Sequence, residues 1–334
     1  MKNLSNYILE AKNRNLDIDR RQPKSRSELE MIISGAFKRK QYDLNFIDTS
    51  KITDMSELFE GVKHNFDVSS WDVSNVKDMS KMFSRCYAFT GKGLENWDVS
   101  NVTDMSHMFN LCYKFTGKGI ENWDVSNVKD MSYMFTDCFK FNCDLSNWDV
   151  SNVTDMSHMF DSCSIFIGKG LENWDVSNVT NMYSMFLHCK KFDCDLSNWD
   201  MSNVINTSLM FCVFDRCEKF DCDLSNWNIT NVKTTGYMFA GCKNFKGKGL
   251  ENWDVSNVKE MISMFYNCVN FEGKGLENWD VSNVKYMTSM FDGCKKFNCD
   301  LSDWNTTNVK GARNMFKGCD KLTIPSWYKL YHKK

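Results

Sequence analysis

Proline and histidine are scarce in this chain of 334 residues. Its two prolines, Pro23 and Pro325, lie near the two ends, and none lies between them. Because proline cannot donate a backbone N–H group, this absence is expected where most of the backbone takes part in regular pairing. The five histidines form no Ser-His-Asp or Cys-His arrangement that can be argued from spacing, so we expect no enzymatic activity.

Signals for membrane insertion and export are also lacking. No apolar run approaches the ~20 residues that span a bilayer, and the N-terminal stretch has no apolar core followed by a small-residue cleavage site. The net charge of −2 provides no general attraction for nucleic acid or an anionic membrane. We therefore expect no membrane span and no nucleic-acid partner, and a protein that is cytoplasmic or associated with a host cell or a virion.

Cysteine, in contrast, is abundant, with fifteen copies. The odd number, the length of the chain and the missing export signal favour reduced thiols in a reducing compartment over a disulfide framework. No C-x₂-C pair occurs, whereas structural zinc needs four clustered ligands. We expect no cofactor, and we interpret most of the cysteines as small buried side chains.

An internal repeat dominates the chain. The stretch "NWDVSNVTDMSHMF" occurs at residues 96–109 and again at 147–160. Tryptophan recurs every 25 or 26 residues, with a single spacing of 28 where three residues are inserted around "FCVF". A Phe follows each Trp by twelve positions, and a Cys usually follows that Phe by three. The tryptophans that mark the units are Trp71, Trp97, Trp123, Trp148, Trp174, Trp199, Trp227, Trp253, Trp279 and Trp304.

A unit of this length is too short for two packed helices and fits one turn of a solenoid. We predict an α/β repeat solenoid of about eleven coils of 25–26 residues. The segment "L-S-x-W-D-V" predicts a short strand, and "MSxMFxxC" predicts a short helical or 3₁₀ turn. Trp, Val, Met, Phe and Cys would form buried columns, and the Asn of "SN" would form a ladder between coils.

The two ends of the chain depart from the repeat. We predict an N-terminal cap at residues 1–46, the solenoid at 47–320 and a C-terminal cap or tail at 321–334. Within the N-terminal cap, "SRSELEMIISGAFKRK" predicts an amphipathic helix that opens with a capping box of Ser27 and Glu30.

The repeated motif resembles that of a known family. "FIDTSKITDMSELF" followed by tandem "NWDVSNVTDMSHMF" is similar to the BspA-type leucine-rich repeats, long described as a domain of unknown function in mycoplasmas. The resemblance covers about residues 43–327 and implies a leucine-rich-repeat-like solenoid. It also implies surface or adhesion roles in bacterial members. The missing export signal and the Cys in every complete repeat look more like an intracellular or giant-virus member.

Positions that vary between units indicate where a partner would bind. They include the position two before each core Phe and the two lysine-rich positions after the Cys. Stacked, they would form a basic, partly aromatic stripe, and the alternative is an ordinary solvated face. The predicted partner surface consists of Lys81, His107, Tyr133, His158, Tyr237, Lys114, Lys140, Lys190, Lys191, Lys219, Lys243, Lys295 and Lys296.

Three kinds of function remain open at this point. The first is a non-enzymatic scaffold that presents an extended surface to a protein partner. The second is a structural or surface component, of a virion or a cell surface, that self-associates through the solenoid ends. The third is a metal-dependent binding module that uses the repeated Asp residues, although Asp next to Ser more often caps backbone turns.

Overall fold

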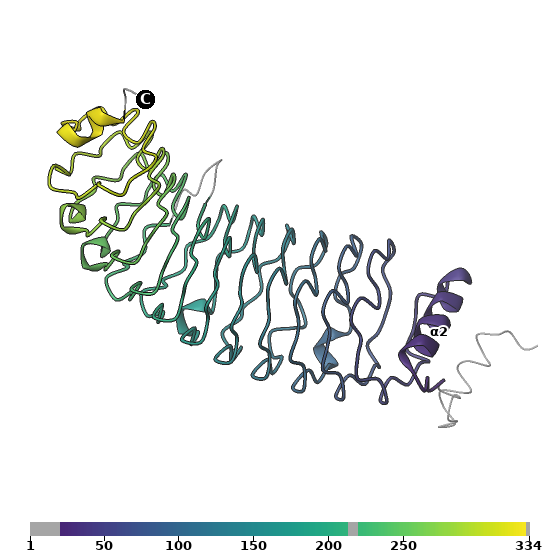
Figure 1. Ribbon diagram of the computed structural model, residues 1–334. Helices are drawn as coiled ribbons and strands as arrows, with labels where there is room; N and C mark the ends of the chain where they lie inside the picture. Colours follow the sequence, from purple (N-terminus) through teal and green to yellow (C-terminus); the bar gives the residue numbers. More distant parts are fainter. Residues whose placement is uncertain (1–20, 213–219, 332–334) are drawn as a thin grey trace, which may run out of the picture.

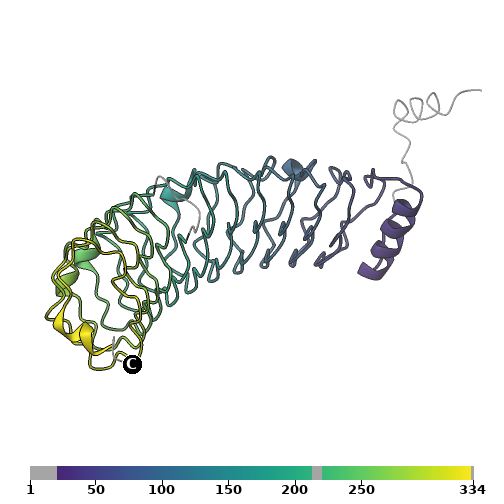
Figure 2. The same ribbon diagram turned by 90° about the horizontal axis from the view of Figure 1, so that it is seen from above.

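The structure is a computed structural model that describes residues 21–212 and 220–331. Its coils stack side by side into a long, curved solenoid, with helix α2 (Arg26–Lys38) at one end and the 3₁₀ helix η5 (Ser326–Leu330) at the other (Figure 1). The view from above shows the same curvature and the open turns of the coils (Figure 2). The structure therefore shows the array of repeated coils that we predicted. Residues 1–20 of the predicted N-terminal cap, residues 332–334 of the predicted C-terminal tail and Lys219 lie outside the described residues.

Isolated parallel β-bridges join the same position of successive coils. They link eleven residues in one line, which agrees with the predicted number of coils. These residues are Asp54, Asp78, Asp104, Asp130, Asp155, Asn181, Asn206, Thr234, Glu260, Tyr286 and Gly311.

One wall of each coil, which follows the bridge residue, carries most of the contacts between coils. In the coil that contains Phe83, every second N–H group donates to a carbonyl of the next coil at 2.7–3.0 Å. The intervening N–H groups close local turns, such as Met82 N–H to the Met79 carbonyl at 3.1 Å. The donor–acceptor pairs are Met79–Asp104, Lys81–Ser106, Phe83–Met108 and Arg85–Asn110.

This wall is not the helical turn that we predicted for "MSxMFxxC". Lys81 and Arg85 have φ angles of 55° and 59°, in the left-handed region, and the equivalent positions of other coils do the same. Left-handed residues four positions apart interrupt a helix, and in this conformation alternate N–H groups point toward the next coil. The prediction of short strands at "L-S-x-W-D-V" is also wrong, because the described residues contain isolated bridges and no strand.

The backbone pairing gives the solenoid a direction. The N–H groups of the wall point toward the C-terminal coil, and the carbonyls of the wall point toward the N-terminal coil. At the N-terminal end the Arg26 guanidinium donates to the Ser56 carbonyl and to the Asp54 carboxylate. At the C-terminal end the backbone of Met315 and Phe316 hydrogen-bonds to the Tyr328 side chain. Burial raises the pKa of Tyr328 by more than these hydrogen bonds lower it. Each end is thus covered by a group of the opposite hydrogen-bonding character.

Helix α2 covers the first coil with the face that the sequence predicted. Leu29, Ile33 and Ala36 are buried against the core. The N-cap, however, is Ser25 rather than Ser27: its hydroxyl accepts the N–H group of Glu28 at 3.3 Å. None of the helices in the described part of the chain is long and apolar enough to cross a membrane.

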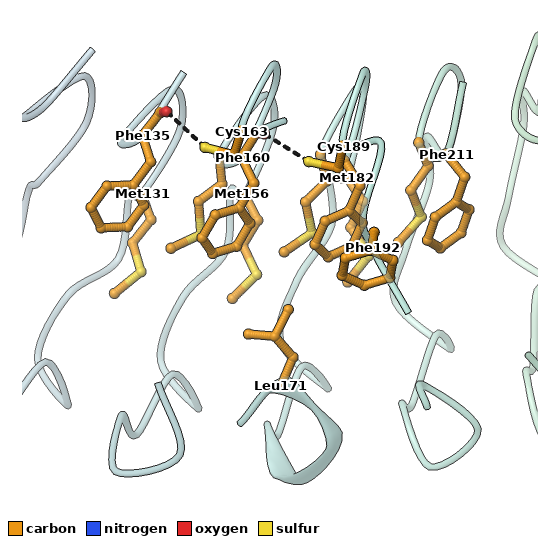
Figure 3. Packing of buried hydrophobic residues seen from close by; sticks show 14 of the residues in the cluster. Met131, Phe135, Met156, Phe160, Cys163, Leu171, Met182, Cys189, Phe192 and Phe211 are labelled. Carbon is orange, nitrogen blue, oxygen red and sulfur yellow. Dashed lines mark hydrogen bonds between the residues drawn. The ribbon is translucent and has the colours of Figure 1, made fainter. Parts of the chain in front are cut away.

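The core consists of continuous columns of buried side chains. Phe135 stacks on Phe109 and Phe160 with ring centroids 5.8 and 5.7 Å apart, and it is fully buried. Met131, Met156 and Met182 stand in a parallel column in successive coils (Figure 3). The Phe column continues through Phe211, the unit with the insertion, at 5.6 and 5.8 Å from its neighbours. No coil could bury these side chains alone, so each coil depends on the next.

The predicted Asn ladder is confirmed. In every full unit the Asn side-chain amide donates to the backbone carbonyl of a Ser or Thr in the preceding coil, as Asn75 does to Ser50 at 2.9 Å. The other members are Asn101, Asn127, Asn152, Asn178, Asn203, Asn231, Asn257, Asn283 and Asn308. Each amide replaces a hydrogen bond that a turn carbonyl would otherwise make with water.

The links between Phe and the next Trp come in a long form with "GKG" and a short form with "CDLS". The long link exposes its Lys between two buried glycines, and in four units it contains a 3₁₀ turn: η1 (Leu94–Asn96), η2 (Leu171–Asn173), η3 (Leu250–Asn252) and η4 (Leu276–Asn278). Where a long link follows a short one, the Lys of the long link pairs with the Asp of the short link in the preceding coil, as Lys169 does with Asp144 at 2.7 Å.

Replacing Lys169 by Met is expected to raise the pKa of Asp144 from about 2 toward its ordinary value. The hydrogen bond from Lys169 is the largest cause of the lowered pKa, followed by the hydrogen bonds from Ser146, and the charge of Lys169 adds to them. A lowered carboxyl pKa stabilises the fold above the ordinary pKa and loses that effect as the pH falls toward 2. The measurement is an NMR titration of the carboxyl carbon. Lys118→Met, in a long link that follows another long link, is the control and should leave Asp144 unchanged. An unaltered pKa in Lys169→Met would show that the pair does not form.

Candidate partner-binding surface

The structure divides the predicted stripe into two different columns. Lys81, His107, Tyr133, His158 and Tyr237 lie in the wall, two positions before the core Phe, and all have φ between 55° and 58°. The predicted lysines instead follow the core Cys, where they are exposed. The described members of this second set are Lys114, Lys140, Lys190, Lys191, Lys243, Lys295 and Lys296.

His107, Tyr133 and His158 are brought together as a stack of rings. The ring centroids of Tyr133 lie 4.3 Å from His107 and 4.2 Å from His158, with the planes within 14° of parallel. Burial, and then the charge of Lys81, lowers the pKa of His107. His158 Nδ1 lies 3.1 Å from the Asp161 carboxylate. The rings are half-buried and cover one another, so this stack offers a partner little surface.

The other two wall residues stand apart from this stack. The Lys81 ammonium pairs with Glu57 at 2.8 Å, which raises the pKa of Lys81 and lowers the pKa of Glu57. Tyr237 is separated from His158 along the column by Ser184 and Leu209. The wall is therefore held mainly by contacts within the chain, and the exposed column is the better candidate for a partner.

Three residues of the exposed column were missed by the sequence reasoning. The position directly after the Cys is Lys in three later coils, at 190, 243 and 295, but Tyr87, Tyr113 and Phe139 in three consecutive earlier ones. Their exposed fractions are 40, 37 and 43 %, and their ring centroids are 4.9 and 5.1 Å apart. We call these three residues the aromatic edge. In the sequence the same position is aromatic in three units in a row, but this pattern does not distinguish an exposed column from a buried one.

The cysteine column is buried and hydrogen-bonded. Each thiol donates to the carbonyl of the core Phe in the preceding coil, as Cys163 does to Phe135 at 3.1 Å and Cys189 to Phe160 at 3.0 Å (Figure 3). Burial raises the pKa of Cys163 well above its ordinary value. These thiols are thus more than small apolar side chains, because they also satisfy a carbonyl of the wall.

The described thiols are expected to react very slowly in the native protein. Cys194 is the described cysteine that is not fully buried, yet burial raises its pKa to about 12. At pH 8 only about one part in ten thousand of such a thiol is thiolate, the reactive form. In a Cys217→Ser background, which removes the cysteine outside the described residues, we expect slow labelling led by Cys194 and complete labelling in denaturant. The additional replacement Cys194→Ser should abolish the earliest labelling of the native protein. Thiols that stay unlabelled in denaturant would reveal disulfides instead.

An acidic cavity lies between two adjacent short links. It measures about 410 Å³ and is lined by Cys194 and Cys222 together with Asp193, Asp195, Asp221 and Asp223. Cys222 Sγ lies 3.4 Å from the Asp195 carboxylate. Within residues 21–212 and 220–331, no group of three or more His, Cys, Asp or Glu side chains is arranged to hold a metal ion.

The repeated Asp residues are engaged in turns. Asp72 accepts both the N–H group of Ser74 at 3.0 Å and its hydroxyl at 2.6 Å. Asp98 does the same with Ser100, and these bonds lower the pKa of Asp98. Carboxylates used in this way are local turn caps, as the neighbouring Ser residues suggested.

Comparison with known protein families gives a match. The sequence profile of the family described as "Mycoplasma protein of unknown function, DUF285" fits five overlapping stretches, at residues 2–93, 27–142, 88–170, 166–249 and 236–329. No curated protein matches the chain. The five matches agree with the tandem repeat and extend over nearly the whole sequence.

Proposed function

Because the chain belongs to the family described as Mycoplasma protein of unknown function, DUF285, and is one continuous stack of repeats, we propose that it is a non-enzymatic scaffold for protein–protein interaction. The observation that carries this proposal is the contrast between a constant core and one exposed column whose residues change from coil to coil. The core positions repeat Trp, Met and Phe, whereas the position after the Cys is aromatic in three successive units and then varies among Ser, Lys, Glu, Val and Asp. Repeat solenoids use such extended surfaces for binding.

The reducing compartment and the relation to BspA-type repeats belong to the same proposal. The buried, hydrogen-bonded thiols support a reducing cytoplasmic, host-cell or virion-associated location, since they serve the fold without disulfides. The shared W-D-V-S-N-V motif supports the relation to the leucine-rich repeats.

Proximity labelling in cells tests the scaffold directly. The full chain, fused to a biotin ligase, should label a reproducible set of proteins that a ligase alone does not label. Recovery of no protein above that background would contradict the proposal.

Self-association through the ends is the alternative, and the end caps argue against it. α2 covers the first coil, and η5 covers the last. Arg26 and Tyr328 already occupy backbone groups that an added coil would need. Light scattering after size-exclusion chromatography separates the two ideas, because a scaffold with capped ends should elute as a monomer. A concentration-dependent dimer or filament would favour a structural component.

A further inference from the structure

The aromatic edge is the largest run of exposed apolar side chains along the exposed column. Tyr87, Tyr113 and Phe139 occupy one position of three successive coils, and Ile165 of the fourth coil is 44 % exposed. Single exposed apolar residues need no explanation, whereas a contiguous patch usually marks an interaction site. This patch is built on rigid coils, so it is already formed before a partner arrives.

The rings present their edges to solvent rather than their faces. Tyr113 stacks on Tyr87 and on Phe139, with planes inclined by 26° and 24°. The faces of the middle ring are therefore covered by its neighbours. Nucleic-acid bases bind aromatic side chains by stacking on ring faces, and this edge offers few of them. The rim of an aromatic ring carries partial positive charge, which favours an anionic group.

Lysines surround the aromatic edge. Lys114 and Lys140 directly follow Tyr113 and Phe139 in the chain and are exposed. Lys63 occupies the equivalent position in the coil before Tyr87, and Lys190 occupies it in the second coil after Phe139, with Ser164 in the coil between.

Acidic side chains weaken this positive charge only in part. Asp137 is half-buried and, after burial and the charge of Tyr87, contributes to the raised pKa of Tyr113. Burial, and then the charge of Asp161 in the next coil, raises the pKa of Asp137. Two carboxylates therefore stand against the four exposed lysines named above. The surface therefore combines apolar contact area with net positive charge, which complements a partner of the opposite composition.

We infer that the aromatic edge binds an extended, acidic polypeptide segment that carries aromatic or aliphatic side chains. The apolar side chains would pack on Tyr113 and Phe139, and the carboxylates would face Lys114 and Lys140. This inference rests on the proposed scaffold function and adds to it the place and the chemistry of the partner.

The test begins with a display library of random twelve-residue peptides selected on the full chain. Two variants map the site: Tyr113→Ser with Phe139→Ser, and Lys114→Glu with Lys140→Glu. The matched control is Lys129→Glu with Lys259→Glu, the same change of charge at exposed lysines of another column. All of these positions are exposed, so unchanged melting temperatures should show that the variants fold.

The selected peptides should be rich in Asp and Glu and should contain aromatic or aliphatic residues. Their affinity, measured by fluorescence polarisation, should fall at least about tenfold in each of the two site variants, because central aromatic residues and opposed charges dominate such contacts. The control variant should change the affinity by less than about twofold. Added salt should weaken binding to the wild-type chain.

Three outcomes would overturn the inference. Selected peptides that bind the Tyr113→Ser/Phe139→Ser variant as tightly as the wild type would place binding elsewhere, and the scaffold proposal would stand. Preferential binding of a single-stranded RNA oligonucleotide at the same edge would assign it to another class of partner. Failure to select any peptide would remove the inference, and only a failed proximity-labelling experiment as well would remove the scaffold proposal.

Discussion

Replacing Phe135 by Ala is expected to lower the free energy of unfolding by about 3–5 kcal/mol, the usual range for removing a fully buried Phe. The ring lies in the middle of the array and contacts Phe109 and Phe160 in its own column at 5.8 and 5.7 Å. It also lies 4.1 Å from Phe141 and 6.1 Å from Trp148, measured between ring centroids. Removing it opens a cavity that continuous columns on both sides cannot close.

Chemical denaturation measures the loss, and hydrogen exchange locates it. Because each coil contacts only its neighbours, protection should fall most in the coils around residue 135 and least near the ends. The control lies four residues away in the same coil: Phe139 is 43 % exposed, so Phe139→Ala should change stability by no more than about 0.5 kcal/mol. If both variants lost the same stability, the column would not hold the coils together. The two variants also distinguish a Phe of the core from a Phe of the surface, because only Phe139 belongs to the aromatic edge.

Replacing Gly170 by Ala is expected to cost about 2–5 kcal/mol, the sum of backbone strain and overpacking. Gly170 has a φ of 95°, which L side chains rarely adopt, and it precedes the 3₁₀ helix η2. An added Cβ would lie 2.2 Å from the Ser146 backbone nitrogen and 2.6 Å from the Leu145 carbonyl carbon. These atoms belong to the backbone of the preceding coil, so they can move only if the two coils separate.

Gly61→Ala isolates the conformational part of this effect. Gly61 also has a positive φ, 74°, but nothing lies within 4 Å of the position that its Cβ would take. We expect a loss of about 1–2 kcal/mol there, from the left-handed backbone alone. Thermal unfolding of the two variants and the wild type measures the loss of stability in each variant. The difference between the two losses is the cost of the close approach between coils at Gly170. Equal losses would mean that close approach between coils at Gly170 is unimportant.

The repeat made the overall array of coils predictable from the sequence, whereas the backbone conformation of the wall was not predicted. The period, the buried columns and the Asn ladder all follow from residues that recur in every unit. The wall was mistaken for a helical turn because Met, Phe and Cys at helical spacing also lie on one side of a wall that has left-handed residues four positions apart. Glycine would have signalled the left-handed positions. Here Lys81, His107 and Tyr133 occupy them, held by hydrogen bonds to the next coil.

The candidate site was predictable in part for a similar reason. The lysines after the Cys were found because their type does not suit a core. Tyr113 and Phe139 share their residue types with the buried columns, so sequence alone could not assign them to the surface. Tyr113 and Phe139 directly follow a buried Cys and are exposed. Phe115 and Phe141 stand three positions after the same Cys and are buried. Only the geometry of the coil distinguishes the two positions.

The direction of the backbone pairing has a consequence for how such a chain can change its length. In the wall, every coil presents carbonyls on its N-terminal side and N–H groups on its C-terminal side, at the same positions of the unit. Each coil therefore pairs with the coil that follows it in the same way. Whole units can be gained or lost between Arg26 and Tyr328 without leaving unpaired backbone groups in the wall. Duplication of whole units would lengthen the surface and keep the fold, and the fourteen identical residues at 96–109 and 147–160, two units apart, agree with such an origin.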